Sequence, residues 1–181
     1  MKIRLAQINP IVGDLEYNSN LIKDTILCSK GFDLIVFPEL SLTGYPPQDL
    51  LLDEKFILET QEALLDIKQI VDDQVVILGL PIYEDKSLMN SALVIQNQEI
   101  IGCHSKVLLP TYDVFDETRY FVASDKISPI PVTINGEEIS IGVQICEDLW
   151  DEDYSLKVTE TLISKGAEMI INISASPYRK N

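Results

Sequence analysis

The sequence of 181 residues has few of the side chains that metal sites and histidine-based catalysis require. Its one histidine, His104, would have to serve alone in any His-based catalytic triad or multi-histidine metal site. The cysteines number three and include no CxxC pair, so they fit neither a disulfide framework nor a zinc cluster. We therefore predict no metal site.

Long apolar runs and an excess of basic charge are also missing. No apolar run approaches the roughly 20 residues of a membrane-spanning helix. The start, MKIRLAQINPIVGDLEYN, alternates polar and apolar residues where a secretory leader would be continuously apolar. With 14 basic and 29 acidic residues the net charge is −15, which opposes binding to nucleic acid or anionic lipid. We expect a cytoplasmic protein with no nucleic-acid or membrane partner.

What is present is the composition of a globular domain, with 46% hydrophobic and 24% charged residues. Apolar runs rich in branched residues recur along the chain, and helical patterns separate several of them. We expect strands over 2–9, 33–37, 75–80, 91–96, 99–106, 138–146 and 169–173. Helices are expected over 18–29, 54–71 and 155–165, and loops over 42–52 and 106–128, the second with a helical turn. The pattern predicts an α/β fold with a mixed sheet.

The last expected strand, 169–173, lies only a few residues before the end of the sequence. A buried strand normally has neighbours on both edges. We therefore expect residues 1–181 to form an incomplete domain whose C-terminal part is missing.

Three residues with useful chemistry follow apolar runs. Glu39 follows DLIVFP, Lys106 follows EIIGCHS, and Cys146 follows EISIGVQI. Active sites of α/β folds lie at the C-terminal ends of strands. A cysteine, a carboxylate and a lysine brought together would provide a nucleophile, a proton carrier and an oxyanion-stabilising cation, and would need no histidine.

Each of these residues also has a simpler interpretation. A cysteine that ends a strand is often an inert apolar side chain, and glutamates and lysines are mostly solvated. His104 is expected to pack in the interior or face solvent. The acidic run over 147–153 is expected to be solvated and to place negative charge at the start of the following helix. Spacing by itself does not decide between these interpretations.

Three segments resemble the signature segments of the nitrilase superfamily and occur in the same order. They are LIVFPELSLTGY around Glu39, SKVLLPTYDVFDETRYF around Lys106, and IGVQICEDLW around Cys146. Within that superfamily, TGYPPQDLL, VFDETRYF, CEDLW and SASPY are most similar to the glutamine-hydrolysing domains of glutamine-dependent NAD synthetases. The resemblance covers the whole chain and implies a nitrilase-like α-β-β-α sandwich with mixed sheets.

The resemblance implies roles for individual residues. Glu39 would be the general base and acid, Lys106 the oxyanion-stabilising cation, and Cys146 the nucleophile. Glu117 would support this set, and the backbone N–H of Glu147 would be a second oxyanion donor. Residues expected to contact the substrate are Tyr45, Tyr112, Phe115, Ser174 and Ser176.

The implied reaction is hydrolysis of the side-chain amide of L-glutamine through a cysteine thioester. The ammonia would serve NAD synthesis from deamido-NAD. The resemblance implies no cofactor for this domain, because ATP and deamido-NAD would be used by a synthetase domain. That domain, with its glycine-rich nucleotide loop, is not found in these 181 residues and would act in cis or in trans. The resemblance also implies a homo-oligomer. One departure is Gln48, where the synthetases commonly have an acidic residue.

Two other functions are compatible with the same residues. A stand-alone nitrilase-type amidase could act on another small amide with the same Glu39, Lys106 and Cys146. A truncated chain could instead be an inactive fragment or an interaction module, with exposed apolar edges that favour association.

Overall fold

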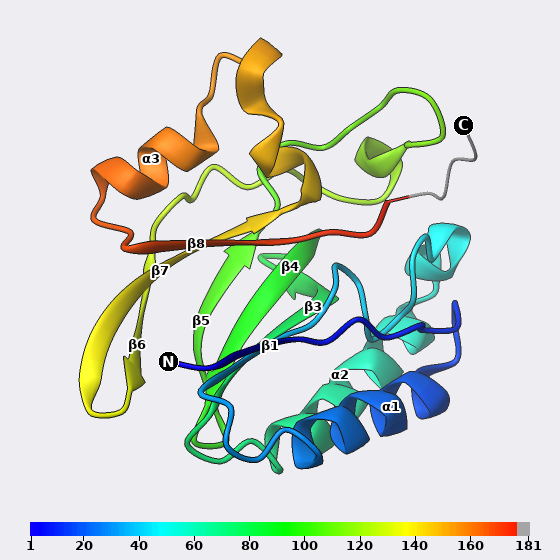
Figure 1. Ribbon diagram of the computed structural model, residues 1–181. Coiled ribbons are helices and arrows are strands. Elements are labelled where there is room, and N and C mark those ends of the chain that lie inside the picture. Colours follow the sequence, from blue (N-terminus) through cyan, green and yellow to red (C-terminus); the bar gives the residue numbers. More distant parts are fainter. Residues whose placement is uncertain (177–181) are drawn as a thin grey trace, which may run out of the picture.

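Two β-sheets form the centre of the computed structural model, which describes residues 1–176 (Figure 1). The first sheet has the order β1 (Ile3–Leu5), β2 (Leu34–Val36), β3 (Val75–Glu84), β4 (Ser87–Gln96) and β5 (Glu99–Ser105). Its strands β1, β2 and β3 are parallel, and β4 and β5 continue it as antiparallel neighbours. The second sheet consists of β6 (Ile130–Ile134), β7 (Glu137–Ile145) and β8 (Met169–Ile173). In it, β6 and β7 are antiparallel, and β7 and β8 are parallel.

Helices cover the outer faces of the two sheets. Helices α1 (Leu15–Leu27) and α2 (Glu54–Lys68) pack on the first sheet, and α3 (Val158–Ser164) packs on the second (Figure 1). An aspartate side chain accepts a backbone N–H bond at the start of each helix, where the first N–H groups have no partner within the helix. Asp14 accepts from Tyr17 N at 3.0 Å, Asp53 from Lys55 N at 2.9 Å, and Asp151 from Val158 N at 2.7 Å.

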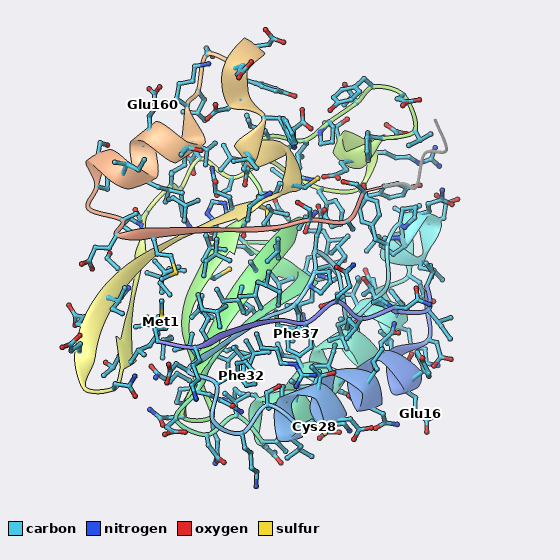
Figure 2. The ribbon with its side chains drawn as sticks, viewed as in Figure 1. Met1, Glu16, Cys28, Phe32, Phe37 and Glu160 are labelled. Atoms are coloured by element: carbon cyan, nitrogen blue, oxygen red, sulfur yellow. The ribbon has the colours of Figure 1, made fainter. Side chains whose placement is uncertain are left out.

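The apolar core is divided among these layers. Branched side chains of both sheets meet in the centre, for example Val36 and Ile77 from the first sheet and Val143 and Ile173 from the second. Phe37 points instead into the layer between the first sheet and helices α1 and α2 (Figure 2). The order helix, sheet, sheet, helix is the α-β-β-α sandwich with mixed sheets predicted from the sequence, and that prediction is confirmed.

Strand β6 was not predicted from the sequence. Pro129 and Pro131 argue against a strand at this place, because proline cannot donate a hydrogen bond to a neighbouring strand. Its alternating buried and exposed residues are nevertheless those of a half-buried strand. The turn to β7 is Asn135-Gly136, with φ of 54° and 81°, which is the geometry of a tight hairpin turn. This Asn-Gly pair was the available signal.

Several boundaries also differ from the sequence prediction. The first strand covers only Ile3–Leu5, because Gln7 N and Ile8 N bond locally to Leu5 O and Ala6 O. The first helix begins earlier than expected, after its cap at Asp14, and the third begins at Val158. The segment 106–128 is a loop with one 3₁₀ turn, Glu117–Arg119, as predicted. Within residues 1–176, no helix has the length and apolar character needed to cross a bilayer.

Candidate active site

The three predicted catalytic residues are delivered by different strands to one region between the sheets. Glu39 follows β2, Lys106 directly follows β5, and Cys146 directly follows β7. All three are buried, with exposed fractions of 1%, 1% and 8%. The two sheets therefore both contribute to the site.

The ammonium of Lys106 lies between two carboxylates. Its Nζ is 2.8 Å from Glu39 Oε1 and 2.8 Å from Glu117 Oε1. Burial disfavours the charged ammonium and would lower the pKa of Lys106, but the two carboxylates outweigh burial and raise the pKa above its usual value. Lys106 is therefore a fixed positive charge in this site.

The Glu39 carboxylate is held by three donors. Lys106 Nζ and Asn90 Nδ2 both donate to Oε1 at 2.8 Å, and the backbone N–H of Ala175 donates to Oε2 at 3.0 Å. Sequence analysis missed Asn90. The available signal was a polar amide inside the apolar strand β4, where a buried side chain needs a partner.

Glu117 belongs to the same buried group. It accepts a hydrogen bond from the Tyr45 hydroxyl at 3.2 Å in addition to the bond from Lys106. Burial raises the pKa of Glu117, although the Lys106 ammonium opposes the rise. The structure thus places Glu117 beside the predicted catalytic set, where a supporting role was expected.

Cys146 occupies a tight turn at the end of β7. Its φ of 47° lies in the left-handed region, which is unfavourable for a residue with a side chain. Burial and the Glu39 charge raise the pKa of the thiol to about 11, and Lys106 opposes this rise. The Ser174 side chain also opposes this rise in the pKa. The charges of Glu39 and Lys106 thus both act on the thiol. With this raised pKa the thiol is protonated at neutral pH.

A pocket of about 440 Å³ opens beside this group. Glu39 and four of the five predicted substrate contacts line it, namely Tyr45, Phe115, Ser174 and Ser176. The fifth, Tyr112, packs edge-on against Phe115 with ring centroids 5.7 Å apart, and lies at a neighbouring pocket with Glu147. Of the SASPY segment, Pro177 and Tyr178 lie outside the described residues.

The carboxylates of Glu147 and Asp148 are buried, so the prediction that the acidic run over 147–153 is solvated is wrong for its first members. Glu147 accepts hydrogen bonds from the hydroxyls of Tyr112 at 2.8 Å and Tyr154 at 2.9 Å. Burial and the bond to Glu147 raise the pKa of Tyr154 to about 12. The expected negative charge at the start of the following helix is present in Asp151, whose carboxylate accepts from the backbone N–H of Val158, the first residue of α3.

The site is therefore suited to acyl chemistry at a carbonyl. It combines a thiol, a carboxylate that can carry its proton, and a fixed cation near the position of a developing oxyanion. Across residues 1–176, no three side chains of His, Cys, Asp or Glu are grouped so that they could hold a metal ion.

Comparison with known proteins supports the family resemblance found in the sequence. The carbon-nitrogen hydrolase family model matches residues 2–181. The chain is 41% identical to the glutamine-dependent NAD(+) synthetase of Aquifex aeolicus over 187 aligned residues, and 37% identical to that of Thermotoga maritima over 183. The matches cover 100% and 98% of this chain, but the chain spans only 31% and 30% of the relatives' lengths.

Solved structures agree with this assignment. The glutamine-dependent NAD+ synthetase from Acinetobacter baumannii, in complex with adenosine diphosphate, superposes with a TM-score of 0.86 at 32% identity. That match covers 98% of this chain and 32% of the synthetase. An amidase from Nesterenkonia sp. shares the fold, with a TM-score of 0.77 at 19% identity over 96% of this chain and 64% of its own. The resemblance predicted from the signature segments is confirmed: the chain belongs to the carbon-nitrogen hydrolase family.

Proposed function

We propose that this chain hydrolyses the side-chain amide of L-glutamine through a thioester on Cys146. The observation that supports this most directly is the buried ammonium of Lys106, which is held 2.8 Å from both Glu39 and Glu117 and whose charge lowers the pKa of the Cys146 thiol. The similarity to relatives named glutamine-dependent NAD(+) synthetases supports glutamine as the substrate.

The first half of the reaction forms the thioester. Because the thiol is protonated at neutral pH, Glu39 takes its proton as the sulfur attacks the amide carbon. Negative charge develops on the carbonyl oxygen, and Lys106 and the backbone N–H of Glu147 stabilise it, each by about 3 kcal/mol if well aligned. Glu39 then gives its proton to the amide nitrogen, the C–N bond breaks, and ammonia leaves.

The second half restores the enzyme. Glu39, again a carboxylate, takes a proton from a water molecule as the water oxygen attacks the thioester carbon. The same two donors stabilise the second oxyanion. The C–S bond breaks, glutamate leaves, and the proton returns to the Cys146 sulfur.

The proposal includes a use for the ammonia. A synthetase domain, in cis or in trans, would consume it with ATP and deamido-NAD. The chain spans 31% of the Aquifex relative, which leaves room in that protein for a separate synthetase domain. Self-association and a cytoplasmic location stay predictions from the sequence.

The test is the Cys146→Ala variant, with glutamate and ammonia release measured from glutamine. We expect complete loss of hydrolysis with an unchanged circular dichroism spectrum, because alanine removes the nucleophile and little else. Cys28→Ala, which changes an exposed cysteine, is the matched control and should keep wild-type activity. Hydrolysis by Cys146→Ala would contradict the mechanism. A wild-type chain that hydrolyses other small amides but not glutamine would contradict the substrate.

A further inference from the structure

A second buried polar pair, His104 and Asp148, belongs to the same two chain segments as Lys106 and Cys146. His104 is on β5, two positions before Lys106, and Asp148 is two positions after Cys146. His104 Nε2 and Asp148 Oδ2 are 3.0 Å apart, and the two side chains are 1% and 0% exposed. Neither residue has a part in the mechanism proposed above.

The Asp148 carboxylate joins the two chain segments that deliver Lys106 and Cys146. Its Oδ1 accepts from the backbone N–H groups of Val107 at 3.0 Å and Leu108 at 2.9 Å, directly after Lys106. Its Oδ2 accepts from the backbone N–H of Ile145 at 3.1 Å, directly before Cys146, and contacts His104. One buried carboxylate thus binds both the segment that carries Lys106 and the segment that carries Cys146.

This link matters because the two catalytic residues come from different sheets. Lys106 ends a strand of the first sheet and Cys146 ends a strand of the second. The core between the sheets consists largely of branched apolar side chains, whose attraction is non-directional. The hydrogen bonds to Asp148 are directional and buried, so they determine how the two strand ends are placed relative to each other.

We propose that Asp148 and His104 are positioning residues that hold the Cys146 sulfur in place against Lys106 and Glu39. Asp148 binds both segments, and His104 fixes the orientation of the Asp148 carboxylate. For turnover of glutamine this inference rests on the proposed function. A misplacement of about 1 Å in an active site can reduce the rate about a hundredfold.

The test compares His104→Leu with His104→Gln. Leucine removes the bond to Asp148, whereas glutamine keeps an N–H donor at a similar reach. Thr159→Val is the matched control, since it removes the 2.8 Å bond from Gln144 near the same turn without touching the Asp148 side chain. One readout is kcat and KM for glutamine.

The second readout needs no glutamine. It is the rate of iodoacetamide alkylation at Cys146 relative to Cys28 in the same molecule, measured by mass spectrometry at pH 8. Cys28 is exposed at the end of α1 and serves as the internal reference (Figure 2). Burial keeps the Cys146 thiol protonated, so a loosened turn should make it react faster.

We expect His104→Leu to lower kcat at least about tenfold with KM nearly unchanged, and to raise the alkylation ratio several-fold. His104→Gln should restore both values, and Thr159→Val should change neither. The inference is overturned if His104→Leu matches wild type in the alkylation ratio, if His104→Gln is as impaired as His104→Leu, or if Thr159→Val is equally impaired. If the wild-type chain does not hydrolyse glutamine, the proposed function fails, and the alkylation ratios still decide the positioning role.

Asp148→Asn gives a second, independent variant. The asparagine amide accepts hydrogen bonds through its one oxygen only. Its NH₂ group replaces the second carboxylate oxygen and faces N–H donors there. We expect kcat to fall and the alkylation ratio to rise, both by more than in His104→Leu. A folded Asp148→Asn chain with wild-type values would overturn the inference, and if this variant does not fold, the two His104 variants decide it.

Discussion

Gly79 on β3 lies directly against the backbone of Glu39: a Cβ atom at position 79 would be 2.9 Å from the Glu39 Cα. It would also be 2.5 Å from Pro38 O and 2.6 Å from Leu40 N. The chain at Glu39 turns sharply here, since Leu40 has a φ of 47°. The backbone at Glu39, the predicted general base, can lie this close to β3 only because residue 79 has no side chain.

Gly79→Ala should displace Glu39. The added methyl group meets backbone atoms, which cannot move aside as a flexible side chain can, so the turn must shift. We expect kcat for glutamine to fall at least about tenfold and the free energy of unfolding to fall by about 1–3 kcal/mol. Gly102→Ala is the control, because the three atoms nearest to its added methyl group all belong to the Ile130 side chain, the first at 2.4 Å, and none belongs to the segment around Glu39. Equal loss of activity in both variants would show that overpacking alone explains the effect.

Glu39→Gln should separate thiol reactivity from catalysis. Glu39 is among the groups that raise the pKa of Cys146, so its neutral amide should lower that pKa and increase the thiolate fraction, about tenfold per pKa unit. Iodoacetamide should then alkylate Cys146 faster at pH 8, while glutamine hydrolysis is lost because no group can carry the proton. Faster alkylation with retained hydrolysis would contradict the role of Glu39 as the proton carrier.

Asn90→Ala should weaken catalysis through the orientation of Glu39. The variant removes one of the two donors to Glu39 Oε1, a hydrogen bond to a charged group worth about 1.5–3 kcal/mol. We expect kcat to fall about tenfold or more with little change in KM. Ser91→Ala is the matched control: it removes the neighbouring buried bond between Ser91 and Ser105, at 2.8 Å, and should leave kcat near wild type.

Sequence reasoning succeeded where the signal is local in the chain. Glu39, Lys106 and Cys146 each follow an apolar run inside a recognisable segment, so their places at strand ends followed from the pattern and the resemblance. The pattern of strands and helices indicated an α/β fold with a mixed sheet, whereas the four layers followed from the resemblance. Strand β6 was missed although its signal is also local. Its prolines argue against a strand, and they outweighed its alternating residue pattern and the Asn-Gly turn after it.

The residues that sequence reasoning missed act through contacts between distant segments. Asn90 lies 51 positions from Glu39 in the chain, and Asp148 lies 44 positions from His104. Nothing near Asp148 in the sequence distinguishes it from the solvated acidic residues that follow it. Three of the four donors to its carboxylate come from the distant segment around Lys106 and one from the local turn, so its burial could not be predicted from local composition.

Lys106→Met should make stability depend on pH. The ammonium separates the carboxylates of Glu39 and Glu117, and without it both remain buried with no countercharge. The pKa of Glu117, already raised by burial, should rise further because the Lys106 charge that lowers it is gone. A carboxyl group with a raised pKa in the folded state stabilises the fold below its unfolded pKa, and this contribution is lost as pH rises through the folded pKa.

The free energy of unfolding of Lys106→Met, from urea titrations, should therefore approach wild type near pH 4.5 and fall below it by about 3–5 kcal/mol at pH 7. Adding Glu117→Gln to Lys106→Met removes one of the facing carboxylates and should restore much of the stability at pH 7. Lys55→Met, which breaks an exposed pair with Glu59, is the control and should show no such trend. A constant difference between Lys106→Met and wild type from pH 4.5 to pH 7 would mean that Lys106 contributes packing rather than charge to the site.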